Sequence, residues 1–158
     1  MLKTAELFDL ERVPEALRAL LDAEYPWEAL TLLDGFGSTL QDNRSAGTVH
    51  PSAIVEGPLY MEEGAEVGPC AYLTGPVYLA AGAKVGHAAY LRGPVVLGPG
   101  AHVMHASEVK RSLLLGGAKA PHFNYVGDSI VGHDVNLGAG VKLANFKTTG
   151  TEISVSGT

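Results

Sequence analysis

The sequence predicts a mainly β fold: a parallel β-helix of six-residue repeats with a short helical segment at its N-terminus. Large apolar residues recur at every sixth position through most of the chain. This period fits neither an α-helix, at about 3.6 residues per turn, nor a simple strand, whose side chains alternate. The 158 residues also include 20 glycines and 9 prolines, which suits a chain with many tight turns.

Residues 1–40 have the spacing of short amphipathic helices. Two apolar runs open at Pro14 and Pro26, and proline suits a first helical turn because its missing N–H would be unpaired there. Their apolar positions are Leu17, Leu20 and Leu21, and then Leu30, Leu32 and Leu33. We expect Gly35 and Gly37 to break the second helix. The prediction is an arm of two short helices that pack on a larger body, and a partner-binding arm is the alternative.

The polar stretch 41–48 lacks periodicity and is predicted to be a linker, and the β-helix domain is predicted over 49–158. The apolar residues that begin each period are Val49, Val55, Met61, Val67, Leu73, Leu79, Val85, Leu91, Leu97, Val103, Val109 and Leu115. These side chains are expected to point inward. We expect Gly68, Gly86 and Gly98 to supply turn conformations that other residues resist.

This pattern resembles the hexapeptide-repeat proteins, which implies a left-handed β-helix of triangular section with three repeats in each coil. Residues eighteen apart then lie one strand spacing apart, so Arg92 stacks on Lys110 and His87 on His105. Two stacked cations suit a phosphate, which arginine holds bidentately and lysine as a point charge. The alternative is two solvated cations that point apart. Glu108 is placed to orient either Lys110 or His105.

The six-residue phase breaks after Leu115, and residues 118–125 interrupt it before it resumes. Interruptions in solenoids are often loops on the binding face, so we expect a loop here. It contains His122 and Tyr125, and a histidine titrates near neutrality and can act as a general base. A capping or packing histidine is the alternative. Asp128, which follows, is expected to satisfy turn N–H groups.

A more specific resemblance covers roughly residues 90–146. Its motifs are Glu108-Val-Lys110, Lys119-Ala-Pro-His122, Tyr125-Val-Gly-Asp128, Ile130-Val-Gly132 and Val135-Asn-Leu-Gly-Ala-Gly140, ending at Asn145. In order and spacing they are similar to the acetyltransferase half of the bacterial bifunctional N-acetylglucosamine-1-phosphate uridyltransferase/glucosamine-1-phosphate acetyltransferase family. That family makes UDP-N-acetylglucosamine, a nucleotide sugar.

The resemblance implies a sugar-phosphate acyltransferase that moves an acyl group from a coenzyme A thioester, acetyl-CoA or another acyl-CoA, to a hexosamine 1-phosphate. It implies that Arg92 and Lys110 hold the phosphate and that His122 is the catalytic base. The implied substrate contacts are Tyr125, Asn136 and Asn145. Backbone amides near Gly138, Ala139 and Gly140 are candidates to stabilise the oxyanion. The resemblance also implies a homotrimer and no metal.

The sequence departs from the family at Phe146 and Thr151, where the family has tyrosine and lysine. In the family, the coils that form the coenzyme A site lie C-terminal to the matched region. A chain ending at Thr158 is therefore expected either to be truncated or to lack the half of the site that binds the acyl donor. One alternative is therefore a non-catalytic trimeric scaffold or sugar-phosphate-binding protein. Another is a γ-carbonic-anhydrase-like zinc site at His87 and His105, joined by His102 or His122.

Charge and composition exclude other function classes. The net charge is −6 and no basic run occurs, which argues against a nucleic-acid partner. No apolar run approaches the about 20 residues of a membrane span. The single cysteine, Cys70, excludes an internal disulfide and fits a reducing compartment. We expect a cytoplasmic bacterial protein.

Overall fold

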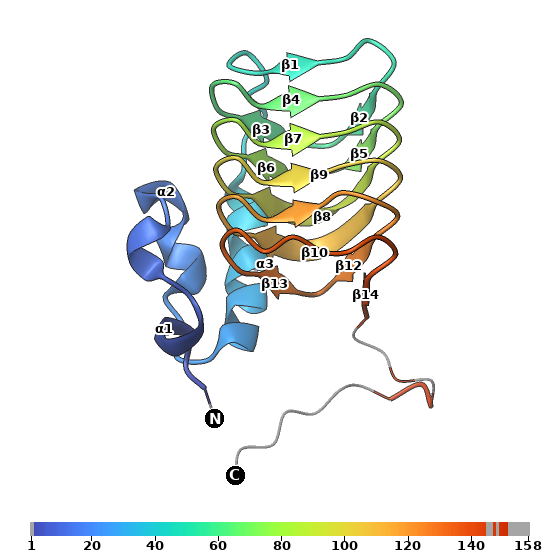
Figure 1. The fold of residues 1–158 in the computed structure, drawn as a ribbon. Helices are drawn as coiled ribbons and strands as arrows, with labels where there is room; N and C mark the ends of the chain where they lie inside the picture. Colours follow the sequence, from blue (N-terminus) through green and yellow to red (C-terminus); the bar gives the residue numbers. More distant parts are fainter. Residues whose placement is uncertain (1, 145–146, 148, 152–158) are drawn as a thin grey trace.

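The chain forms a left-handed parallel β-solenoid with a helical arm against one side (Figure 1). The computed structural model describes residues 2–144, 147 and 149–151. The first coil lies at the top of Figure 1, and successive coils descend toward the C-terminus. The predicted fold class is therefore confirmed.

Most strands are short because each repeat holds one strand and one turn, whereas β8 and β10 continue through a corner. Their bounds are β1 Thr48–Val49, β2 Ile54–Glu56, β3 Leu59–Met61, β4 Glu66–Val67, β5 Tyr72–Thr74, β6 Val77–Leu79, β7 Lys84–Val85, β8 Tyr90–Leu97, β9 His102–Val103, β10 Glu108–Leu114, β11 Lys119–Ala120, β12 Tyr125–Gly127, β13 Ile130–Val131 and β14 Lys142–Leu143. One sheet has the order β1-β4-β7-β9-β11, and the other has β14-β12-β10-β8-β5-β2, with β3, β6 and β13 pairing alongside. The two sheets form neighbouring faces of the solenoid.

The six-residue period places its apolar side chains inside the solenoid. Glu66 pairs with Lys84 and Lys84 with His102, so each coil takes eighteen residues over this stretch. The period-start residues from Met61 to Val109 are buried in one continuous core, together with the small residues of the corners. Burying a Leu or Val side chain contributes about 1.5–3 kcal/mol, so this column is a major source of stability.

The glycines act differently from the prediction. Gly68, Gly86 and Gly98 are not among the residues with positive φ, whereas Gly64, Gly82, Gly100 and Gly117 are, in one column of corners. The first set is needed for close approach instead. A Cβ on Gly98 would lie 2.8 Å from Gly116 N, and one on Gly86 would lie 3.0 Å from Met104 Cα.

The coil shortens by one residue at Arg111. Lys110 still pairs with Arg92, eighteen residues back, but Ser112 pairs with Val95, seventeen residues back. Arg111 alone turns the corner, with a left-handed φ of 43°, opposite two residues of the preceding coil. The phase therefore changes here, before the position where the sequence showed a break.

This shift corrects two predictions. Leu114 takes the inward position that the six-residue count gave to Leu115, and Leu115 instead faces the helical arm. The interruption over 118–125 is not an inserted loop, because Lys119–Ala120 is strand β11 and pairs with β9. The apparent interruption is the downstream consequence of one missing residue.

The arm contains short helical pieces and one longer helix. They are α1 Thr4–Leu7, 3-10 turn Leu10–Arg12, α2 Glu15–Arg18, 3-10 turns Ala19–Leu21 and Pro26–Glu28, and α3 Ala29–Thr39. The two predicted runs begin at their prolines, but Gly35 and Gly37 do not break the second one, since α3 continues to Thr39. Gly37 is buried against the solenoid, where a Cβ would lie 2.8 Å from Pro94 Cβ. This helix therefore contains glycine because only glycine fits at the contact.

The arm packs on the solenoid through a second apolar core. Its buried arm residues are Val13, Leu17, Leu20, Leu21, Ala29 and Leu33, and its solenoid residues are Tyr78, Ala80, Val96, Leu113 and Leu115. This confirms the expectation that the N-terminal helices pack on a larger body. Two ion pairs at its edges, Arg12 with Asp134 at 2.7 Å and Arg111 with Asp34 at 2.5 Å, also join the arm to the solenoid.

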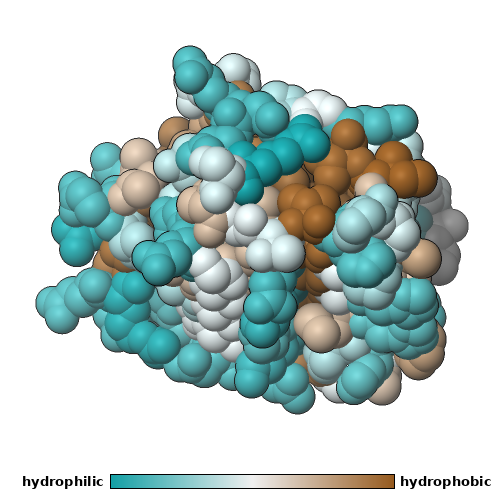
Figure 2. Space-filling view, turned by 90° about the horizontal axis from the view of Figure 1, so that it is seen from above, coloured by the Kyte–Doolittle hydropathy of each residue, from teal (hydrophilic) through white to brown (hydrophobic). Residues whose placement is uncertain are grey.

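The first coil leaves part of its core uncovered. Val49, Ala53 and Val55 are only partly buried, and Ile54 is 58% exposed. Figure 2 looks onto this end and shows a hydrophobic area within a mainly hydrophilic surface. Within the described part of the chain, no helix combines the length and the apolar character needed to cross a membrane.

Candidate functional site

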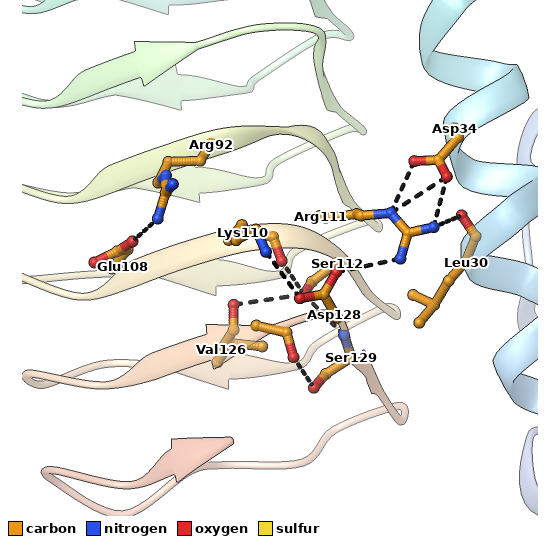
Figure 3. A network of polar contacts seen from close by, with 11 residues as sticks. Leu30, Asp34, Arg92, Glu108, Lys110, Arg111, Ser112, Val126, Asp128 and Ser129 are labelled. Atoms are coloured by element: carbon orange, nitrogen blue, oxygen red, sulfur yellow. Dashed lines mark hydrogen bonds and ion pairs between the residues drawn. The ribbon is translucent and has the colours of Figure 1, made fainter. Parts of the chain in front are cut away.

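Arg92 and Lys110 lie one above the other on the face formed by β8, β10 and β12. The stacking predicted from their spacing is therefore confirmed. Arg92 Nη1 donates to Glu108 Oε1 at 2.9 Å, and Lys110 Nζ donates to Asp128 Oδ2 at 3.1 Å (Figure 3). Each cation thus has a carboxylate beside it, and the repulsion between the two cations is reduced.

These pairings leave both cations able to hold an anion. The side chain of Arg92 is 44% exposed and that of Lys110 is 35% exposed. A guanidinium and an ammonium each have more N–H donors than one carboxylate oxygen uses. The hydrogen bond to Glu108 also raises the pKa of Arg92 above its usual value, so this group stays charged.

Tyr125 belongs to the same face. It pairs with Glu108 in the neighbouring strand, and Gly127 pairs with Lys110. A Cβ on Gly127 would lie 2.7 Å from the Tyr125 hydroxyl, so the phenol folds over this glycine, one coil below the Lys110 backbone. The structure therefore brings the two predicted phosphate-binding cations and the predicted tyrosine onto one face.

His122 lies at the corner between β11 and β12, where the two sheets meet. Its backbone N–H donates to Asn124 Oδ1 at 3.0 Å, and Asn124 Nδ2 donates to Gly138 O at 2.7 Å. Gly140 N donates to His122 O at 2.9 Å, so this amide of the predicted oxyanion turn is engaged. Asn124 is 2% exposed and connects the backbone of His122, the candidate base, to the turn Gly138–Gly140. Ala139 is the middle residue of this turn.

The predicted asparagines are placed differently. Asn136 forms a bridge with Lys119, which is on the sheet of β9 and β11, a different face from that of Arg92 and Lys110. Asn145 lies outside the described residues, as does Phe146. One chain therefore does not bring Asn136 together with the two cations.

The two histidines of the metal alternative do stack. The His87 and His105 rings lie 5.4 Å apart with 7° between their planes, and His87 Nδ1 lies 3.2 Å from the Pro69 carbonyl oxygen. His105 also contacts Phe123 edge to face. Among the residues that the structure describes, no three His, Cys, Asp or Glu side chains are arranged to hold a metal ion.

Four residues of this region were missed by the sequence analysis or have further partners in the structure. Asp128 binds the side chains of Lys110 and Arg111, which the sequence analysis did not anticipate, and Glu108 binds Arg92 instead of Lys110 or His105. Asn124 had a visible signal, since a large polar residue stands at a position that is small or apolar in most other coils. The role of Arg111 depends on the shortened corner, which no residue pattern marks.

Comparison with known proteins assigns the family. The family model described as "GMPPB C-terminal domain" matches residues 73–158, more than half of the chain. The chain belongs to the GMPPB C-terminal domain family. The match includes the strands that carry Arg92, Lys110 and Tyr125, and the corner that carries His122.

Relatives of this GMPPB C-terminal domain are similar over most of the chain. A bifunctional sugar-1-phosphate nucleotidylyltransferase/acetyltransferase of Sulfurisphaera tokodaii is 33% identical over 136 residues, 86% of this chain and 34% of that protein. A bifunctional protein GlmU of Methanococcus aeolicus is 34% identical over 137 residues, 85% of this chain and 33% of that protein. GlmU of Leifsonia xyli subsp. xyli is 67% identical over 30 residues, 19% of this chain and 6% of that protein. The chain spans about a third of the length of the first two relatives.

Proposed function

We propose that this chain is an acyltransferase of the sugar-phosphate class, which transfers an acetyl or other acyl group from a coenzyme A thioester to the amino group of a hexosamine 1-phosphate. The observation that carries the proposal is the stacked pair Arg92 and Lys110, on the same face as Tyr125, whose strand β12 follows the His122 corner. The relatives named as nucleotidylyltransferase/acetyltransferases support the same reaction class.

In the proposed reaction, the phosphate binds Arg92 and Lys110, which orient the sugar and take no part in bond making. His122 accepts a proton from the 2-amino group as its nitrogen attacks the thioester carbonyl. The C–N bond forms, the C–S bond breaks, and the thiol of coenzyme A leaves with a proton. Amides of the Gly138–Gly140 turn that are not engaged with His122 would face the oxyanion.

We further propose that the site is completed in a homotrimer. Asn136 lies on a different face from Arg92 and Lys110, so a neighbouring copy is the means by which both faces can meet one substrate. Sedimentation analysis should give a species of three times 16.5 kDa, and a monomer would contradict this part of the proposal.

Calorimetric titration with glucosamine 1-phosphate tests the proposed function. The wild type should bind, and Arg92→Ala should lose most of this binding. Lys84→Ala is the matched control, because Lys84 is also a half-exposed cation paired with a carboxylate, Glu66 at 3.2 Å, but on the other sheet. Release of free thiol from acetyl-CoA in the presence of the sugar phosphate then tests transfer.

The internal charge pairing favours a second candidate, a trimeric binding protein or scaffold without catalysis. Arg92 is already paired with Glu108, and Lys110 with Asp128, as on an ordinary ion-paired surface. Sugar-phosphate binding without thiol release would favour the binding protein. Absence of any binding would refute the acyltransferase and leave the scaffold.

A further inference from the structure

The guanidinium of Arg111 joins helix α3 to the solenoid corner where that arginine lies. Arg111 Nε donates to Asp34 Oδ1 at 2.9 Å, and its Nη2 donates to the Leu30 carbonyl oxygen at 3.3 Å (Figure 3). On its other edge, Nη1 donates to Asp128 Oδ1 at 3.2 Å. Because the guanidinium is planar, the arm contacts fix the direction in which its remaining N–H groups point.

Asp128 divides its two oxygens between Arg111 and Lys110. Its side chain is only 9% exposed, while that of Lys110 is 35% exposed. A carboxylate with so little water around it depends on its cationic partners and lies where they hold it. The place of the Lys110 ammonium therefore depends on how Arg111 is held.

The backbone shows that this arrangement is imposed. Arg111 and Asp128 both have left-handed φ, 43° and 46°, which non-glycine residues seldom adopt without support from their surroundings. Ser112, fully buried, donates from Oγ to the Lys110 carbonyl oxygen at 2.7 Å and accepts from Ser129 N at 3.1 Å. The corners at Arg111 and Asp128 thus hold Lys110 and Asp128 in a fixed register.

We propose that Asp34, Arg111 and Asp128 are positioning residues for Lys110, so that helix α3 orients the ammonium at the phosphate site. This inference rests on the proposed function for the identity of the ligand. It gives the helical arm a part in ligand binding, beyond covering one side of the solenoid.

Asp34→Asn and Arg111→Lys test the proposal in the full-length chain. Asparagine keeps the size of Asp34 but removes its charge, and lysine keeps the charge of Arg111 but cannot bridge two carboxylates. Asp134→Asn is the matched control, because it breaks another ion pair between arm and solenoid, with Arg12 at 2.7 Å, outside the Lys110 network. Asp34→Glu, which keeps the charge, should retain much of the sugar-phosphate binding that Asp34→Asn loses.

Two measurements are made on each variant. One is the dissociation constant for glucosamine 1-phosphate, and the other is the rate at which trace acetic anhydride labels Lys110, read by mass spectrometry. Both should rise by about 2- to 30-fold in Asp34→Asn and Arg111→Lys, the range seen along coupled networks, and stay unchanged in Asp134→Asn.

The outcomes separate this inference from the proposed function. Unchanged labelling and binding in Asp34→Asn would overturn the inference and leave the function intact. Equal effects in Asp34→Asn and Asp134→Asn would also overturn it, because general loosening of the arm would explain them. If the wild type does not bind the sugar phosphate, the function fails, while faster labelling in Asp34→Asn alone would still support the positioning of Lys110.

Discussion

The two glycines of α3 should respond to alanine with opposite signs. A Cβ at Gly37 would lie 2.8 Å from Pro94 Cβ and 2.9 Å from Pro76 Cγ, both in rigid rings, whereas Gly35 has nothing within 4 Å. Alanine gains up to about 1 kcal/mol of helix propensity at either position. Overpacking costs about 1–3 kcal/mol, and only Gly37→Ala incurs it. We expect Gly35→Ala to stabilise by about 0.5–1 kcal/mol and Gly37→Ala to destabilise by about 1 kcal/mol.

Urea unfolding followed by circular dichroism measures both variants. Protein concentration must be held constant, because assembly would change the apparent stability. The predicted difference between the two variants is about 2 kcal/mol, well above the error of such comparisons. If Gly37→Ala is as stable as Gly35→Ala, the arm does not lie as close to the prolines as described, and the reasoning from close approach is refuted.

Two further predictions concern the core and the alkaline range. Leu91→Ala, at a fully buried position, should lower the free energy of unfolding by about 2–5 kcal/mol. Ile54→Ala, at an exposed position, should lower it by less than about 0.5 kcal/mol. A similar loss in both variants would contradict the core assignment. Burial, and then a hydrogen bond to Glu62, raise the pKa of Tyr78 above its ordinary value. The contribution of Tyr78 to the free energy of unfolding is therefore complete below about pH 10, where the phenol of the unfolded chain is neutral. This contribution is lost as the pH rises further. Urea midpoints between about pH 8 and 11 should decline less in Tyr78→Phe than in the wild type, and parallel declines would exclude this role.

The solenoid could be predicted from the sequence because the residues that face its interior are apolar and recur at every sixth position. Each coil repeats the same local choice of an apolar residue and a corner, so the series from Met61 to Val109 is enough to give the architecture and the stacking of Arg92 on Lys110. The same regularity explains the error at Leu115. One residue is missing at Arg111, and a count of sixes detects the shift only after the phase has changed.

The rest of the site depends on contacts between distant segments. The sequence gives no reason to pair Asp34 with Arg111, seventy-seven residues away, because the approach of α3 is set by Gly37 against the prolines. Helix propensity alone predicts that the helix ends near Gly37, but the packing of Gly37 on the solenoid outweighs this preference. Asn124 was within reach of prediction, since an amide at an inward position must find partners for its polar atoms.

The arm that packs across β6, β8 and β10 also changes how the solenoid resists unfolding. In a simple solenoid each coil touches only its two neighbours, so coils can be lost one at a time from either end. Here Tyr78, Val96 and Leu113, from three successive coils, share one apolar cluster with Leu17 and Leu33. Removing any of these coils therefore exposes the arm as well. The middle of the solenoid becomes a single cooperative unit, and fraying is confined to the coils that the arm does not span.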